Sequence, residues 1–135
     1  MNISVDTNIL LRFILADDEA QHQSALRLFD EAGSIAIATV TLCEMVWVLQ
    51  RYKIGRQEIA EQINALAHSD KVVVADDEVN AGLDLLEAGG DFADGVAAYV
   101  GRRLAPNGAA AFASFDQAAV RLLSQNGHLA FVPVA

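Results

Sequence analysis

Short apolar segments that alternate with helical patterns constrain the fold of this chain most strongly. Between these segments, apolar residues recur every three to four positions, which is the spacing of amphipathic helices. Such alternation predicts an α/β fold with a mostly parallel sheet and right-handed crossovers. The predicted strands are short, as strands buried on both faces are, and they lie at residues 3–5, 34–37, 72–74, 110–112 and 129–132.

Helices are predicted at residues 9–15, 19–31, 41–49, 57–67, 91–101 and 117–124. Glycines fall where several of these helices should stop, and each is expected to supply the positive φ of a C-terminal cap. These glycines are Gly33, Gly55, Gly89, Gly90, Gly108 and Gly127.

The length of 135 residues fits a single domain, residues 1–135, with one core. No apolar run reaches the roughly 18 residues of a membrane span, and the first residues lack the basic start of a signal peptide. We therefore expect a cytoplasmic protein with no membrane partner. Cys43 and the three histidines show no metal-ligand spacing, so zinc is not expected.

The charge of the chain argues against a simple nucleic-acid-binding module. Its 9 Lys and Arg against 18 Asp and Glu give a net charge of −9, which repels a polyanion. The argument is weaker against an enzyme, because cations bound by acidic residues reverse the sign of the local charge. The positions of the acids therefore matter more than their number.

Two acids follow predicted strands and precede predicted helices. Asp6 comes directly after the strand at 3–5, and Asp116 ends the apolar run at 110–115. Parallel sheets bind their ligands beyond the carboxyl ends of the strands, which is where both acids are expected. Either acid taken alone also fits the N-cap of the helix that follows it.

Two further acids lie inside predicted helices. Glu44 belongs to a segment that is apolar nearly all round and is expected to be buried, although a capping box with Thr41 at the N-cap explains it equally well. Asp94 lies toward the small-residue side of its helix. A solvated carboxylate in a first turn is its alternative, but Asp91 fills that plainer role.

Four acids at the strand-to-helix edges of one small domain are predicted to converge. Packed together without a counter-charge, at least one carboxylate would have its pKa raised. Mg²⁺ or Mn²⁺ removes that cost, because both are oxygen-seeking cations held by carboxylates and substrate phosphate. Such an ion activates water and stabilises the leaving oxygen of a phosphodiester, so the pattern predicts a metal-dependent nuclease.

The order of these motifs resembles the PIN-domain family, and within it the VapC-like ribonuclease toxins of bacterial toxin–antitoxin pairs. The resemblance covers nearly the whole chain. The resembling segments are Val5-Asp6-Thr7-Asn8, Thr41-Leu42-Cys43-Glu44, Phe92-Ala93-Asp94 and Ser114-Phe115-Asp116. Gly95 departs from the alanine of many relatives, and a glycine within a helix predicts local loosening.

The resemblance implies a three-layer α/β/α sandwich with a roughly five-stranded sheet. It also implies an endoribonuclease that cuts structured or transfer RNA, forms a homodimer and is inhibited by a cognate antitoxin with a basic segment. Its implied site has Asp6, Asp94 and Asp116 as ligands of Mg²⁺ or Mn²⁺, Glu44 acting through water, and Asn8 and Ser114 supporting by hydrogen bonds.

Arg12, Arg102 and Arg103 are candidates for binding RNA phosphate, although a solvated helix face is the commoner role for such residues. A metal-dependent phosphatase of the aspartyl-phosphate kind is a weaker alternative. Asn8 stands where its second acid is needed, and Lys53 and Lys71 are the only lysines. A non-catalytic PIN-like binding module is the other alternative. Trp47 offers it support as a partner surface, whereas core packing is the expected fate of its helix.

Overall fold

The computed structural model describes residues 1–105, 107 and 110–134, so the predicted cap at Gly108 lies outside the described residues. The chain divides into two compact units, Met1–Ala75 and Asp76–Ala135, and each is described by itself. The single domain 1–135 stays a prediction. Within the described ranges, no helix combines the length and the apolar character that crossing a membrane requires.

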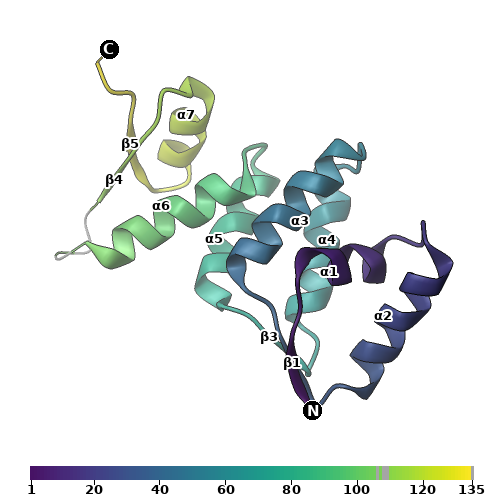
Figure 1. The fold of residues 1–135 in the computed structure, drawn as a ribbon. Coiled ribbons are helices and arrows are strands. Elements are labelled where there is room, and N and C mark those ends of the chain that lie inside the picture. The colour runs from purple at the N-terminus through teal and green to yellow at the C-terminus, as the bar shows by residue number, and fades with distance from the viewer. Residues whose placement is uncertain (106, 108–109, 135) are drawn as a thin grey trace. The chain divides into compact units, whose positions relative to one another are not determined.

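A three-stranded parallel sheet organises the first unit (Figure 1). Strands β1 (Asn2–Ser4), β2 (Ser34–Ala36) and β3 (Val72–Val73) follow each other in that order across the sheet. The crossover from β1 to β2 consists of α1 (Thr7–Ile14) and α2 (Glu19–Glu31). The crossover from β2 to β3 consists of α3 (Thr39–Arg51) and α4 (Arg56–Ala67). Because the strands are parallel, their carboxyl ends all meet one edge of this sheet.

Helix α3 buries one face and exposes the other. Its buried residues are Leu42, Met45, Val46 and Leu49, which recur at helical spacing. The prediction that this apolar segment is buried nearly all round is therefore wrong.

The second unit contains three helices, two of them closely packed against each other, and a two-stranded sheet. Its helices are α5 (Asp76–Glu87), α6 (Phe92–Leu104) and α7 (Gln117–Gln125), and its strands are β4 (Ala111–Ala113) and β5 (Leu129–Phe131). The two strands pair in parallel, with Phe112 opposite Ala130. The α/β class with parallel strands is thus confirmed. A single sheet of about five strands is not, since the described strands form one sheet of three and one of two.

Glycines bring α5 and α6 into close contact. A Cβ added at Gly82 would lie 2.6 Å from the ring of Phe92, and one at Gly95 would lie 2.5 Å from the carbonyl oxygen of Ala81. Gly95 is buried within an unbroken helix. The expectation that Gly95 loosens this helix is wrong, because its missing side chain permits the close approach of α5.

The predicted glycine caps are confirmed at two positions, Gly89 with φ of 100° and Gly127 with φ of 86°. The prediction of positive φ is wrong at Gly33, Gly55 and Gly90. Gly55 instead precedes α4 as its N-cap, with φ of −72°. After α3, the turn uses Lys53, whose φ is 65°.

Candidate functional site

Asp6 is the N-cap of α1, at the point where the chain leaves β1. Its backbone is extended, and its Oδ1 accepts a hydrogen bond of 2.9 Å from the amide of Ile9. The cap interpretation of Asp6 is therefore confirmed. Among the described residues, its second carboxylate oxygen has no hydrogen-bond partner. That oxygen remains available to a ligand, so the cap and the binding role are compatible.

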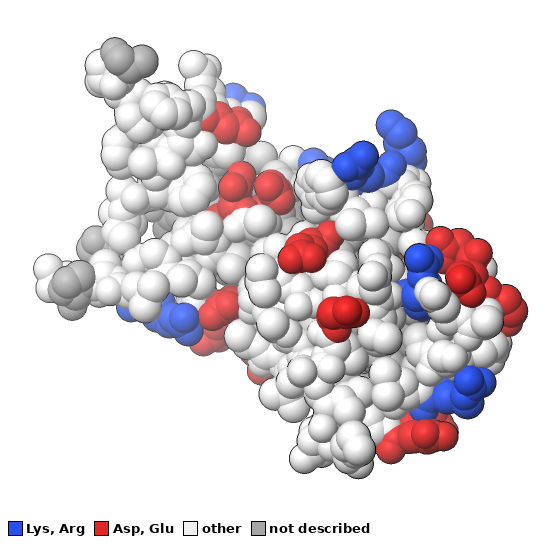
Figure 2. Space-filling view, in the orientation of Figure 1, with Lys and Arg blue, Asp and Glu red and all other residues white. Residues whose placement is uncertain are grey.

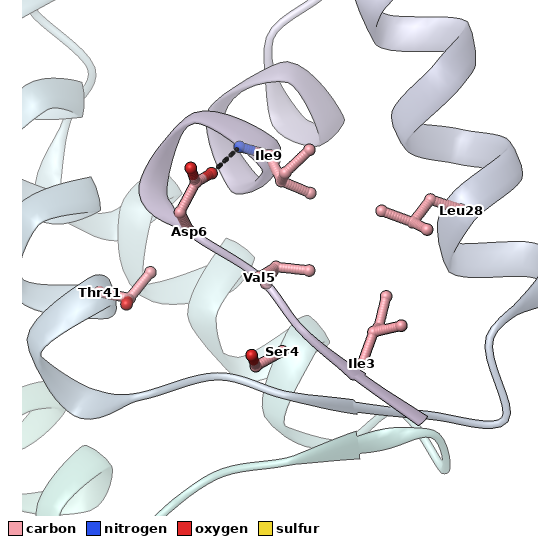
Figure 3. Close-up of a pocket in the computed structure, with 7 residues that line it drawn as sticks. All are labelled: Ile3, Ser4, Val5, Asp6, Ile9, Leu28 and Thr41. Carbon is pink, nitrogen blue, oxygen red and sulfur yellow. Dashed lines mark hydrogen bonds between the residues drawn. The ribbon is translucent and has the colours of Figure 1, made fainter. Parts of the chain in front are cut away.

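Two hollows flank Asp6 in the first unit. Figure 3 shows the first, of about 520 Å³, with Asp6 and Thr41 at its polar side and Ile3, Ile9 and Leu28 at its apolar side. The second, of about 600 Å³, lies between α1 and α2 and is lined by Asp6, Ile9, Leu28 and several polar side chains. These polar residues are Asn8, Arg12, Gln21 and Ser24. Asp6 thus has open space on both sides.

Glu44 is linked to the Asp6 turn by a hydrogen bond. The hydroxyl of Thr7 donates to Oε2 of Glu44 over 2.9 Å, and Glu44 is exposed. The capping-box alternative is wrong, because α3 begins at Thr39 and its N-cap, Ala38, makes no side-chain capping bond. Expected burial of Glu44 is wrong as well. The Thr7 bond instead fixes this carboxylate beside the start of α1.

Asp116 repeats the arrangement of Asp6 in the second unit. It caps α7, and its Oδ1 accepts from the amide of Ala119 over 3.0 Å. Ser114, two residues earlier, accepts a hydrogen bond of 3.0 Å from the Asp116 amide. Within the described chain, the second carboxylate oxygen of Asp116 has no partner. Strand, acidic cap and helix therefore occur in the same order in both units.

Asp94 differs from the two capping acids. It is half-buried in the first turn of α6, and the cap of that helix is Asp91, which accepts from the Ala93 amide over 3.1 Å. Burial raises the pKa of Asp94, and the nearby carboxylates of Asp91 and Asp116 raise it further. In the described part of the chain, no group donates a hydrogen bond to Asp94. The raised pKa of Asp94 is the effect expected of acids packed together without a counter-charge.

The described residues contain no group of three or more His, Cys, Asp or Glu close enough to hold a metal ion. Asp6 and Glu44 lie in the first unit, and Asp94 and Asp116 lie in the second. The structure links the members of each pair, one pair through Thr7 and the other electrostatically. Convergence of all four acids stays a prediction.

The donor set fits Mg²⁺ or Mn²⁺. Both ions take carboxylate oxygens and retain several waters, so one free oxygen from each acid suffices. Asp6, Glu44 and Asp116 each keep one such oxygen, and Asp94 keeps two, as far as the described residues show.

The cations predicted to bind RNA have protein partners. Arg12 pairs with Asp17 at 2.7 Å, and Arg103 pairs with Glu78 at 3.2 Å. Arg102 lies 6.0 Å from the centre of the Tyr99 ring. The two ion pairs compete with phosphate, so Arg12 and Arg103 are weaker candidates than their sequence positions indicated.

The position of Lys71 also counts against the aspartyl-phosphate alternative. The Nζ of Lys71 donates to the carbonyl oxygens of Phe29 and Asp30, over 3.0 and 2.5 Å. A lysine held at the end of α2 is not one that balances a phosphoryl group beside Asp6.

Sequence reasoning missed Thr7 as the partner of Glu44. The signal was present, since Thr7 stands beside Asp6 in the Asp6-Thr7-Asn8 motif. Nothing local indicated a bond to a residue 37 positions away. Such a contact becomes visible only when α1 and α3 are seen together.

A family model described as PIN domain matches residues 3–122 of the chain. Searches of the curated proteins and of the solved structures found no match to the chain.

Proposed function

Because the chain belongs to the PIN-domain family, whose fold is generally that of a nuclease, we propose that it is a Mg²⁺- or Mn²⁺-dependent endoribonuclease. In this proposal Asp6, Glu44, Asp94 and Asp116 share one metal centre. A three-layer sandwich whose parallel sheet has about five strands is part of the same proposal. The family supports the nuclease fold, and the metal, the RNA substrate and the shared centre are inferred.

The observation that carries the proposal is the state of Asp94. A half-buried carboxylate without a hydrogen-bond donor, with its pKa raised by burial and by two other acids, is unfavourable in its ionised form. A bound divalent cation offsets that cost. No solvated surface acid needs such compensation, so Asp94 favours a cation-binding role.

The hydrogen bonds of three of the acids suit defined tasks in this proposal. Asp6 and Asp116 keep one oxygen on the amide of their own helix, so their other oxygens would be free to hold the ion. Glu44, positioned by Thr7, acts through water, and Asn8 and Ser114 support the acids. The ion supplies activation of the attacking water and stabilisation of the departing RNA oxygen.

Cleavage of a structured RNA should be compared between wild type, Asp6→Asn and Asp94→Asn, in Mg²⁺, Mn²⁺ and EDTA. We expect either substitution, and chelation, to abolish cutting.

A matched control exists in the first unit. Asp18 is also an N-cap, accepting from the amide of Gln21, and asparagine caps as well as aspartate does. Asp18→Asn should therefore cut RNA as wild type does. Undiminished cutting by Asp6→Asn, by Asp94→Asn or in EDTA would contradict the proposal.

We further propose that the protein is the toxin of a VapBC-type pair, acting on structured or transfer RNA as a homodimer. Similarity of the four motifs to VapC-like relatives supports this role. A basic antitoxin segment suits a chain of net charge −9. Expression should arrest growth, and co-expression with the neighbouring small gene product should restore it. Normal growth with abundant folded protein would count against the toxin role.

A binding module without catalysis is the second candidate. The exposure of Trp47, at 59%, favours it, because an exposed tryptophan marks a contact surface. This candidate predicts RNA or partner binding with no cleavage in Mn²⁺.

A further inference from the structure

The exposed face of α3 carries a continuous stripe of side chains. Val40, Glu44, Trp47 and Arg51 recur every three or four residues and lie opposite the buried face of the helix. Trp47 is 59% exposed and Tyr52, just after the helix, is 60% exposed. The expected core packing of Trp47 is therefore wrong, and two large aromatic side chains face solvent.

This stripe ends in a basic turn. Residues 45–57 contain three cations, Arg51, Lys53 and Arg56, and no acid, in a chain of net charge −9. Figure 2 shows Lys and Arg side chains gathered over the turn between α3 and α4. Neither Arg51 nor Lys53 forms an ion pair with any described residue. Their charge is thus available to an anionic ligand, unlike that of Arg12 and Arg103.

Aromatic and cationic groups meet in one hollow here. The Arg51 guanidinium lies 4.7 Å from the centre of the Trp47 ring. A pocket of about 360 Å³ is lined by Trp47, Val48, Arg51 and Tyr52. Aromatic faces stack with nucleobases of any sequence, and cations beside them contact the phosphates.

We propose that the surface formed by Trp47, Arg51, Tyr52 and Lys53 binds single-stranded RNA by base stacking and phosphate contact. The inference deepens the proposed ribonuclease function and rests on it for the identity of the ligand. Trp47 lies three residues beyond Glu44, about 4.5 Å along the helix axis. RNA held at this surface is therefore close to one of the proposed catalytic acids.

The charge of this surface favours RNA over protein occupants. A two-fold contact between copies places the same patch on both sides, so Arg51 and Lys53 would face their own like charges. A basic antitoxin segment would meet the same repulsion. A polyanion, by contrast, is attracted by both Arg51 and Lys53.

Binding can be measured apart from cleavage, in EDTA, with a labelled oligouridylate of about ten nucleotides. Trp47 is the only tryptophan of the chain, so RNA stacking should quench the intrinsic fluorescence of the protein. By anisotropy, Trp47→Leu should bind at least about fivefold more weakly, and Trp47→Phe should retain most of the affinity.

Arg51→Gln should weaken binding and reduce the slope of log affinity against log salt by about one. Arg27→Gln makes the same charge change on α2 and should leave the slope unchanged. Wild-type affinity in Trp47→Leu, or equal effects of the two arginine variants, would overturn the inference. So would a change from dimer to monomer in Trp47→Leu with RNA binding unchanged, because the surface would then join two copies.

The experiments can contradict the ribonuclease proposal and the RNA-binding surface independently of each other. Quenching by RNA in a protein that never cuts RNA supports the binding surface and contradicts the ribonuclease. Normal cutting with no loss of affinity in Trp47→Leu contradicts the binding surface alone.

Discussion

Each unit holds one acid as a helix N-cap, Asp6 or Asp116, and the units differ in how they hold the other acid. In the first unit, hydrogen bonds position exposed carboxylates, with Asp6 bound to the Ile9 amide and Glu44 bound to Thr7. In the second, Asp94 is held by the packing of α6 against α5, with no donor among the described residues and a raised pKa. Burial and neighbouring carboxylates disfavour the ionised form of Asp94. If the proposed cation binds, the second unit is therefore expected to gain most from it.

The largest expected effect tests whether acids of both units act together. Asp6→Asn and Asp116→Asn should each reduce RNA cleavage by at least about 100-fold, and the double variant should be little worse than either. Residues that serve one centre are non-additive in this way. Single-turnover cleavage rates of the three variants measure this non-additivity. If the loss in the double variant equals the product of the two single losses, Asp6 and Asp116 do not serve one centre.

A stability effect of about 1–3 kcal/mol tests how α6 holds Asp94. Gly95→Ala places a methyl group against the Ala81 carbonyl and should lower the free energy of unfolding by about that amount. Gly101→Ala, on the same helix, meets no atom within 4 Å and should raise it by up to about 1 kcal/mol. Urea denaturation measures both. A stabilising Gly95→Ala would show that the close packing is not needed.

Gly95 also shows where sequence reasoning stops. Helical periodicity placed α2 at its observed bounds, residues 19–31, and apolar runs located all five strands closely. The same reasoning did not predict α5 and misjudged Gly95, because its role depends on a neighbouring helix. Local rules anticipated the caps at Asp6 and Asp116, whereas the Thr7–Glu44 bond joins distant segments. Periodicity reports one element at a time, and contacts between elements need the fold.

Removing the hydroxyl of Thr7 tests whether its hydrogen bond positions Glu44 for catalysis. Thr7→Val should reduce RNA cleavage by about tenfold, because a hydrogen bond to a charged group is lost. Thr39→Val makes the same change at the start of α3 and should cut RNA normally. Cleavage assays on both variants, with circular dichroism as the folding check, decide the matter. Equal activity would mean that Glu44 needs no positioning by Thr7.

The smallest expected effect is the pH dependence of stability that arises from Asp94. Folding raises the pKa of Asp94, so the folded protein binds more protons than the unfolded chain between the two pKa values. The free energy of unfolding of the metal-free protein should fall as pH rises through that range, and the loss should persist at neutral pH. Asp94→Asn should remove this dependence and slightly stabilise the metal-free protein. Urea denaturation in EDTA at acidic and neutral pH measures both effects. An Asp94→Asn variant that is less stable than wild type would contradict this account.

Calorimetric titration with Mn²⁺ at neutral pH tests the shared metal centre most directly. Asp6→Asn and Asp116→Asn, one in each unit, should both weaken Mn²⁺ binding at least about tenfold, while Asp18→Asn binds as wild type does. Wild-type Mn²⁺ affinity in either Asp6→Asn or Asp116→Asn would contradict a centre built from both units.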